Sequence, residues 1–131
     1  MTLFKVGNFE SHSSGNLKWK VECDALTDAD WDGIVQAAVE LGLLRTEYSQ
    51  ITPIPTGGVP FAESIKRNTA WYRGYMPEGV VLFVDDVLTT GRSMEQARLA
   101  LKLEDFRFAR GIVAFARGPC PDWVKPVWRL G

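Results

Sequence analysis

The segment VVLFVDDVLTTGRSM, residues 80–94, decides the expected fold of this chain. Its first five residues are all apolar, which is typical of a strand buried on both faces inside a parallel sheet. Asp85 and Asp86 end that strand, and Gly91 opens a helix that runs to Leu103. In open α/β sheets, ligands bind beyond the carboxyl ends of the strands, so we expect a site at this junction.

The segments on either side alternate between helical and strand patterns. Helices are expected at residues 27–42 and 60–68, and further strands at residues 51–54, 112–116 and 127–130. Thr27 and Asp30 form a capping-box pattern at the start of the first helix. This alternation predicts a single α/β domain over residues 1–131, with a central, mostly parallel twisted sheet flanked by helices.

The first 25 residues do not follow this alternation. Phe9 to Ser11 and Leu17 to Val21 flank a polar turn rich in serine and glycine. Two short runs around such a turn predict a β-hairpin ahead of the sheet.

The composition excludes several classes of function. The 131 residues are 46% hydrophobic and carry a formal net charge of −1, so a broad basic surface for nucleic acid is not expected. No apolar stretch is long enough to cross a membrane, and the start of the chain lacks the pattern of a signal peptide. Cys23 and Cys120 are the only cysteines, which argues against a disulfide scaffold and a metal site. We expect a cytoplasmic protein.

The chemistry of the junction suits a sugar phosphate. Asp85 and Asp86 offer adjacent carboxylates that need hydroxyl donors, a metal ion or water, and the vicinal hydroxyls of a ribose satisfy them through charge-assisted hydrogen bonds. The loop from Thr89 to Ser93 follows, where backbone N–H groups, hydroxyls and a helix start favour an anion. Gly91 lets the backbone come close to that anion. Together these groups match the polarity of a ribose 5-phosphate.

Other interpretations of the same segment are less specific. A buried strand followed by an ordinary capped turn would also give an apolar run and Thr-Thr-Gly. A Walker P-loop is excluded because no Gly-Lys-Ser/Thr is present, and a dinucleotide-binding fold is disfavoured because GxGxxG is absent. A phosphatase or another phosphate-binding α/β module stays open, although the order Asp-Asp-x-x-Thr-Thr-Gly-x-Ser disfavours it.

The segment resembles the phosphoribosyl pyrophosphate motif of the type I phosphoribosyltransferases. The resemblance implies that Asp85 and Asp86 hold the ribose hydroxyls. The 5-phosphate would be held by Thr89, Thr90, Gly91, Arg92 and Ser93. Residues 53–62, PIPTGGVPFA, resemble the pyrophosphate loop of the same family, in which a non-proline cis peptide often occurs at the position of Pro55–Thr56. The pyrophosphate would be held by Pro55, Thr56, Gly57 and Gly58.

Two further segments resemble the orotate phosphoribosyltransferases within that family. Residues 6–24 resemble their N-terminal segment, which implies that residues 1–25 form a small hood over the nucleobase. Ser14 and Gly15 of this hood would contact the nucleobase. Arg117 follows the next strand, where an arginine of the orotate enzymes contacts the carboxylate of the base. The resemblance covers residues 6–118.

The chain departs from the family between the pyrophosphate loop and the acidic pair. Family enzymes usually carry a long, mobile, basic loop there that supplies a lysine, whereas residues 59–80 have room for one helix and a short connection. The basic residues in this stretch are Lys66, Arg67 and Arg73, and with Asp85 and Asp86 they are the candidate catalytic residues.

The resemblance implies a Mg²⁺-dependent transfer of ribose 5-phosphate from phosphoribosyl pyrophosphate to a nucleobase, orotate or a related pyrimidine. The Mg²⁺ would be carried by the pyrophosphate, with a contact to Asp85 or Asp86. Related enzymes are dimers, so we expect a homodimer that binds small molecules and neither nucleic acid nor a membrane. The shortened stretch leaves an alternative, a regulatory protein that binds phosphoribosyl pyrophosphate without turning it over.

Overall fold

The computed structural model describes residues 4–11, 15–21, 23–44, 48–69, 79–101 and 106–130. The elements in order are β1 (Phe4–Ser11), β2 (Gly15–Val21), the 3-10 turn η1 (Cys23–Ala25), α1 (Asp28–Glu40), β3 (Tyr48–Pro53), α2 (Val59–Asn68), β4 (Gly79–Leu88), α3 (Arg92–Leu99), β5 (Phe106–Ala116) and β6 (Val124–Arg129). This order confirms the α/β alternation expected from the sequence.

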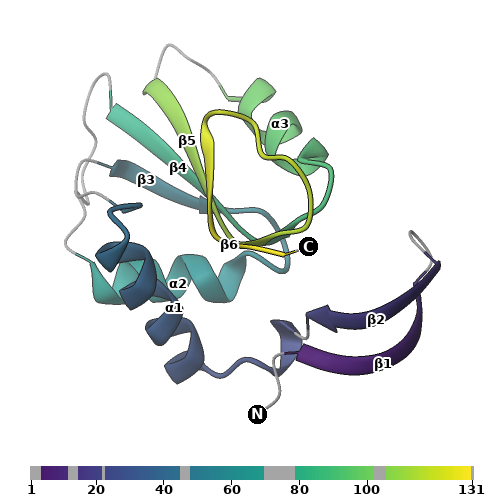
Figure 1. Ribbon diagram of the computed structural model, residues 1–131. Helices are drawn as coiled ribbons and strands as arrows, with labels where there is room; N and C mark the ends of the chain where they lie inside the picture. Colours follow the sequence, from purple (N-terminus) through teal and green to yellow (C-terminus); the bar gives the residue numbers. More distant parts are fainter. Residues whose placement is uncertain are drawn as a thin grey trace.

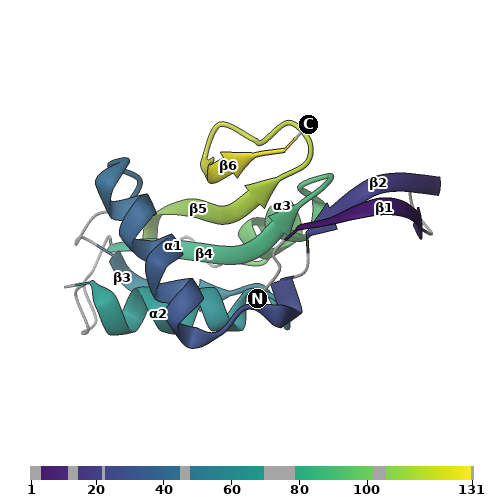
Figure 2. The same cartoon turned by 60° about the horizontal axis from the view of Figure 1, so that its bottom comes forward.

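Strands β3 to β6 form a parallel sheet in the order β3-β4-β5-β6. Helices α1 and α2 cover one face, and α3 lies on the other (Figures 1 and 2). Val80 and Leu82 of β4 belong to the apolar core under α1 and α2. Val81 and Phe83, which alternate with them, belong to the core on the α3 side. The strand is therefore buried on both faces, as its continuous apolar run predicts.

The start of α1 follows the sequence prediction. The Asp30 carboxylate accepts a hydrogen bond from the Thr27 N–H (2.8 Å), and the Thr27 hydroxyl accepts one from the Asp30 N–H (3.2 Å), which completes the capping box. The helix packs on α2 through the rings of Trp31 and Phe61, which stack with centroids 5.2 Å apart. This contact holds α1 beside the first turns of α2.

The acidic pair does not end its strand, contrary to the sequence prediction. β4 continues to Leu88 because its last residues pair with β5, Asp85 opposite Val113 and Leu88 opposite Ala116. The carboxylates therefore project from a paired strand, whose ladder fixes their positions.

The boundaries of other elements also differ from the prediction, and β3 spans Tyr48–Pro53 instead of residues 51–54. β5 begins at Phe106, since the alternating pattern FRFAR pairs with β4 although it is not a continuous apolar run. β6 begins at Val124 and lies at the edge of the sheet, as expected for the last strand. α3 ends at Leu99, where the turn tightens: the Leu101 N–H donates to the Arg98 carbonyl (3.1 Å).

The predicted hairpin is confirmed. β1 and β2 pair antiparallel, with Phe9 opposite Leu17 and Ser11 opposite Gly15. Figure 2 shows the hairpin projecting beyond the carboxyl ends of β4 and β5. Among the helices of the described ranges, none has the length and apolar character needed to cross a membrane.

Candidate functional site

The backbone at the end of β4 holds both acidic side chains. Oδ1 of Asp85 accepts a hydrogen bond from the Asp86 N–H (2.8 Å), and Oδ1 of Asp86 accepts one from the Val87 N–H (2.7 Å). Both residues are half-buried. A carboxylate can accept several hydrogen bonds, so each keeps acceptor capacity for a ligand after this backbone contact.

The surroundings of Asp85 disfavour its charged form. Burial, together with the adjacent Asp86 carboxyl, raises the pKa of Asp85 from 3.8 to about 7. Shifts of this kind concentrate at ligand sites, where a hydroxyl donor or a cation restores the charged form.

The loop after β4 forms a hollow that Asp85 shares. It is lined by Asp85 and by residues 87–94. Gly91 has a φ of +80°, in the left-handed region that favours glycine, and leads the chain into α3. The exposed residues around the hollow are Thr89, Thr90, Arg92 and Ser93. A carboxylate thus lies beside the positive end of a helix, which suits a ligand carrying both hydroxyls and a phosphate.

The glycine loop at residues 55–58 lies directly against the other carboxylate. A Cβ on Gly57 would lie 2.6 Å from Oδ2 of Asp86, so a glycine is needed for this approach. A Cβ on Gly58 would collide with the carbonyl oxygen of Val84, whose strand the loop touches. Two segments that are about thirty residues apart in sequence therefore meet at Asp86, as the resemblance implies.

Asp86 faces a different space from Asp85. A cavity of about 210 Å³ opens beside it. Its polar lining residues are Thr56 and Asp86, and the rest of the lining comes from Gly57, Cys23, Leu26, Trp31 and Pro60. The peptide between Pro55 and Thr56 is cis, as the resemblance implies. The acidic pair therefore stands between a hollow of about 50 Å³ and the larger cavity next to the glycine loop.

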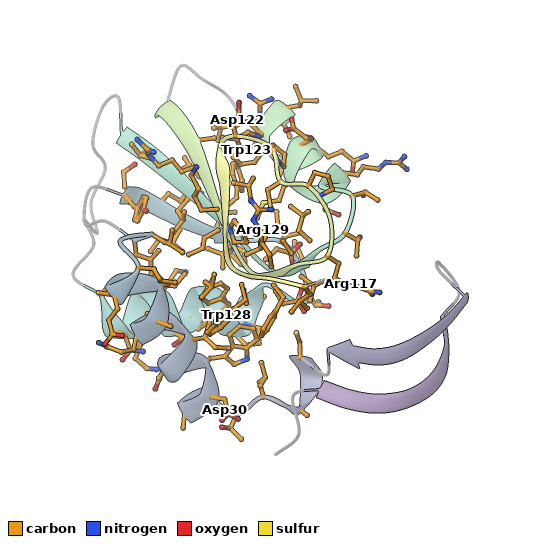
Figure 3. All side chains as sticks on the ribbon, viewed as in Figure 1. Asp30, Arg117, Asp122, Trp123, Trp128 and Arg129 are labelled. Atoms are coloured by element: carbon orange, nitrogen blue, oxygen red, sulfur yellow. The ribbon has the colours of Figure 1, made fainter. Side chains whose placement is uncertain are left out.

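Arg117 follows β5 beside residues 89–93, which we call the phosphate loop after the ligand expected there. Its N–H donates to the Leu88 carbonyl (2.8 Å), and a Cβ on Gly118 would lie 2.5 Å from the Thr89 carbonyl oxygen. Figure 3 shows Arg117 on the side of the sheet nearest the hairpin. Arg117, which is expected to contact the nucleobase, thus lies at the carboxyl ends of the strands, as the acidic pair does.

No family model and no curated protein matches the sequence. Solved structures do match the fold. An orotate phosphoribosyltransferase from Aeropyrum pernix is 18% identical with a TM-score of 0.75, over 98% of this chain and 88% of that one. An orotate phosphoribosyltransferase from Mycobacterium tuberculosis in complex with Fe(III) dicitrate is 16% identical with a TM-score of 0.73, over 97% and 89%. A hypothetical protein from Neisseria gonorrhoeae with bound ppGpp is 15% identical with a TM-score of 0.62, over 80% and 81%.

The fold is that of the type I phosphoribosyltransferases. The expectation from the motif around Asp85 and Asp86 is thereby confirmed at the level of the fold.

The type I phosphoribosyltransferase fold does not bring Lys66 and Arg67 to the acidic pair. α2 starts at the glycine loop and leads away from it, so its last turn lies about 10 Å further along the helix axis. Lys66 pairs with Glu63 (3.6 Å), and Arg67 pairs with Asp32 of α1 (2.6 Å). Within this chain, Arg67 takes part in the contact between α1 and α2.

The remaining predicted residues are Ser14, Gly15 and Arg73. Ser14 and Arg73 lie outside the described residues. Gly15 begins β2 in the hairpin. Their roles at the base and the pyrophosphate stay predictions.

Sequence reasoning missed the connection between β5 and β6. Gly118, Pro121 and Trp123 in this connection contact the phosphate loop or α3. Gly118 directly follows Arg117 and could have been noticed for that reason. The partner of Trp123 is Glu95, and no local pattern links two residues so far apart in sequence.

The acidic pair fits the Mg²⁺ that the fold family implies. Mg²⁺ prefers oxygen ligands and is usually bound by one or two carboxylates together with substrate phosphates. Among the described residues, no group of three or more His, Cys, Asp or Glu side chains could hold a metal by itself. Asp85 and Asp86 are the residues that would hold the ion together with a pyrophosphate.

Proposed function

We propose that this protein transfers ribose 5-phosphate from phosphoribosyl pyrophosphate to a nucleobase in a Mg²⁺-dependent reaction. The observation that carries the proposal is the position of Asp85 and Asp86. One lines the hollow at the start of α3, and the other touches the glycine loop and lines the larger cavity. A ribose bound by the two carboxylates would direct its phosphate to one side and its pyrophosphate to the other.

Each group of the substrate has a matching partner in this chain. The 2′ and 3′ hydroxyls donate to Asp85 and Asp86, and the 5-phosphate accepts from the N–H groups between Thr90 and Ser93. The glycine loop at residues 55–58 lies where the pyrophosphate would extend. The ribose hydroxyls favour the charged form of Asp85, which burial otherwise disfavours.

The reaction exchanges one bond at C1 of the ribose for another. A nitrogen of the base forms a bond to C1 as the bond from C1 to the pyrophosphate oxygen breaks, and the sugar carries oxocarbenium-like charge in between. The two carboxylates orient the ribose and lie near this positive charge. The chain therefore positions the sugar and stabilises its developing charge. When bound, Mg²⁺ neutralises charge on the leaving pyrophosphate.

Orotate or a related pyrimidine is the acceptor that we propose. Arg117 supports this choice of acceptor, since a guanidinium at the carboxyl end of β5 suits the carboxylate of orotate. The ring nitrogen of orotate that bonds to C1 gives up its proton, which the leaving pyrophosphate or water accepts. The proposal includes a homodimer and a cytoplasmic location.

A regulatory protein that binds phosphoribosyl pyrophosphate without turnover is the second candidate. The ion pairs of Lys66 and Arg67 away from the site favour it, because a sensor needs no cation on the leaving group. The compared protein from Neisseria gonorrhoeae, which holds ppGpp, shows that a protein of this fold can bind a nucleotide.

Pyrophosphate release distinguishes the two candidates. The protein is incubated with Mg²⁺, phosphoribosyl pyrophosphate and orotate, uracil or adenine. Release with orotate that is lost selectively in Arg117→Ala supports the enzyme. Binding of phosphoribosyl pyrophosphate without release with any base supports the sensor, and no binding at all rejects both.

A further inference from the structure

The connection between β5 and β6, residues 117–123, runs along the whole phosphate loop; we call it the brace. At its start, the Arg117 N–H donates to the Leu88 carbonyl (2.8 Å). Gly118 then packs against the Thr89 carbonyl, and Pro121 lies 3.5 Å from the position of a Cβ on Gly91. The brace thus touches the loop at successive points from the end of β4 to the start of α3.

The brace ends at Trp123, which contacts α3. The indole Nε1–H of Trp123 donates to Oε1 of Glu95 (2.8 Å). The Arg98 guanidinium lies 5.3 Å from the centroid of the Trp123 ring and pairs with Oε2 of Glu95 (2.8 Å). These hydrogen bonds lower the pKa of Glu95, so its carboxylate stays charged. The other side of the indole meets Phe83 of β4 edge-on, with centroids 6.3 Å apart. Trp123 therefore links α3 to the sheet.

Helix α3 depends on such contacts for its position. It has eight residues, and Met94 is the one that is buried. Isolated helices shorter than about 12 residues are marginal in water, and most helical stability in proteins comes from packing. The first N–H groups of α3 point at a ligand in the hollow only if the helix is held in place.

We propose that Trp123 is a positioning residue that holds the phosphate loop in its binding geometry through Glu95 and Arg98. The inference rests on the proposed function, because it assumes that this loop binds the 5-phosphate. Trp123 does not line the hollow, so it acts through α3 and not on the ligand. The brace also carries Arg117, so the base side and the phosphate side of the site share one support.

Affinity for ribose 5-phosphate, measured by calorimetry well below the melting temperature, is the first test. Trp123→Phe keeps an aromatic ring but loses the N–H to Glu95, and should weaken binding about three- to tenfold, the value of one hydrogen bond. The matched control is Trp128→Phe at the other end of β6, where Trp128 stacks on Phe115 (5.5 Å) and touches no part of α3 (Figure 3). It should bind within about twofold of the wild type.

Comparison of Glu95→Ala with Glu95→Gln distinguishes a positioning role from a general loss of stability. Glu95→Ala should weaken binding as Trp123→Phe does, and the double variant should add little further, since both remove the same link. Glu95→Gln keeps an oxygen acceptor for the indole and should retain most of the affinity.

Amide hydrogen exchange of the unliganded protein completes the test. Trp123→Phe should speed exchange in the phosphate loop and α3 but not in the middle of β4, because the change is a local opening. Unchanged exchange and affinity in Trp123→Phe, or equal weakening in Trp128→Phe, would overturn the proposal. Wild-type protein that binds no ribose 5-phosphate would reject the proposed function, while the exchange comparison would still show whether Trp123 holds the loop.

Discussion

The two sides of the acidic pair are built differently. On the phosphate side, Asp85 shares a hollow with a helix start, and residues 117–123 support the loop from behind. On the pyrophosphate side, Asp86 touches the glycine loop and opens to a larger cavity with an apolar wall. The basic residues of α2 pair with Glu63 and Asp32 instead of reaching that cavity.

The difference indicates which parts of the chain should contribute most to ligand binding. In the proposed complex, the sugar phosphate meets both carboxylates and the start of α3, whereas the leaving group meets the glycine loop and no cation from α2. Binding should therefore depend most on the acidic pair and the loops, and least on the basic residues of α2.

The largest effect is expected from Asp85→Asn combined with Asp86→Asn. The variant loses charged acceptors for two ribose hydroxyls, each worth about 1.5–3 kcal/mol, so affinity for phosphoribosyl pyrophosphate should fall at least about 100-fold. Calorimetric titration measures the loss. Asp28→Asn, an exposed acid in the first turn of α1, is the control and should bind like the wild type. Unchanged affinity in the double variant would refute the role of the pair.

Gly57→Ala tests the contact between the glycine loop and Asp86. The new methyl would lie 2.6 Å from Oδ2 of Asp86 and must displace the carboxylate, so affinity for phosphoribosyl pyrophosphate should fall about tenfold or more. The control is Gly33→Ala in α1, where a Cβ meets nothing within 4 Å. That change should leave affinity intact and stabilise the fold by about 0.5–1 kcal/mol. Equal affinity in both variants would show that the glycine loop does not contribute to binding of phosphoribosyl pyrophosphate.

Asp85→Asn alone should make the unliganded protein more stable, and the gain should depend on pH. The pKa of Asp85 is 3.8 in the reference state and about 7 in the fold, so the folded chain binds the proton more tightly. Stability is therefore lost as pH rises from about 4 to 7 and stays low above that. Because Asp85 is only half-buried, solvent screens much of this effect, so the melting temperature of the variant should exceed that of the wild type by on the order of 3 °C at pH 8, and by little near pH 4. A gain that is independent of pH would contradict the assignment.

Arg67→Ala is expected to have the smallest effect on binding. Arg67 pairs with Asp32, which also accepts a hydrogen bond from the Ser64 hydroxyl, so the change loosens the contact between α1 and α2. The melting temperature should fall slightly, and affinity for phosphoribosyl pyrophosphate should stay within about twofold. A large loss of affinity would instead place Arg67 at the pyrophosphate, for example across a dimer interface.

The sequence predicts those features that depend on local pattern. The apolar run before Asp85 predicts a doubly buried strand, and Thr27 with Asp30 predicts the start of α1. The end of β4 at Leu88 could not be predicted, because pairing with β5 extends the strand through two acidic residues. The link from Trp123 to Glu95 is a tertiary contact between an edge connection and a helix, and it has no local signature.

A crystal structure with ribose 5-phosphate tests the central claim most directly. We expect the phosphate on the N–H groups of residues 90–93 and the ring hydroxyls within about 2.5–3.2 Å of the Asp85 and Asp86 carboxylates. A ribose 5-phosphate bound elsewhere on the protein, with only water in the hollow beside Asp85, would contradict it.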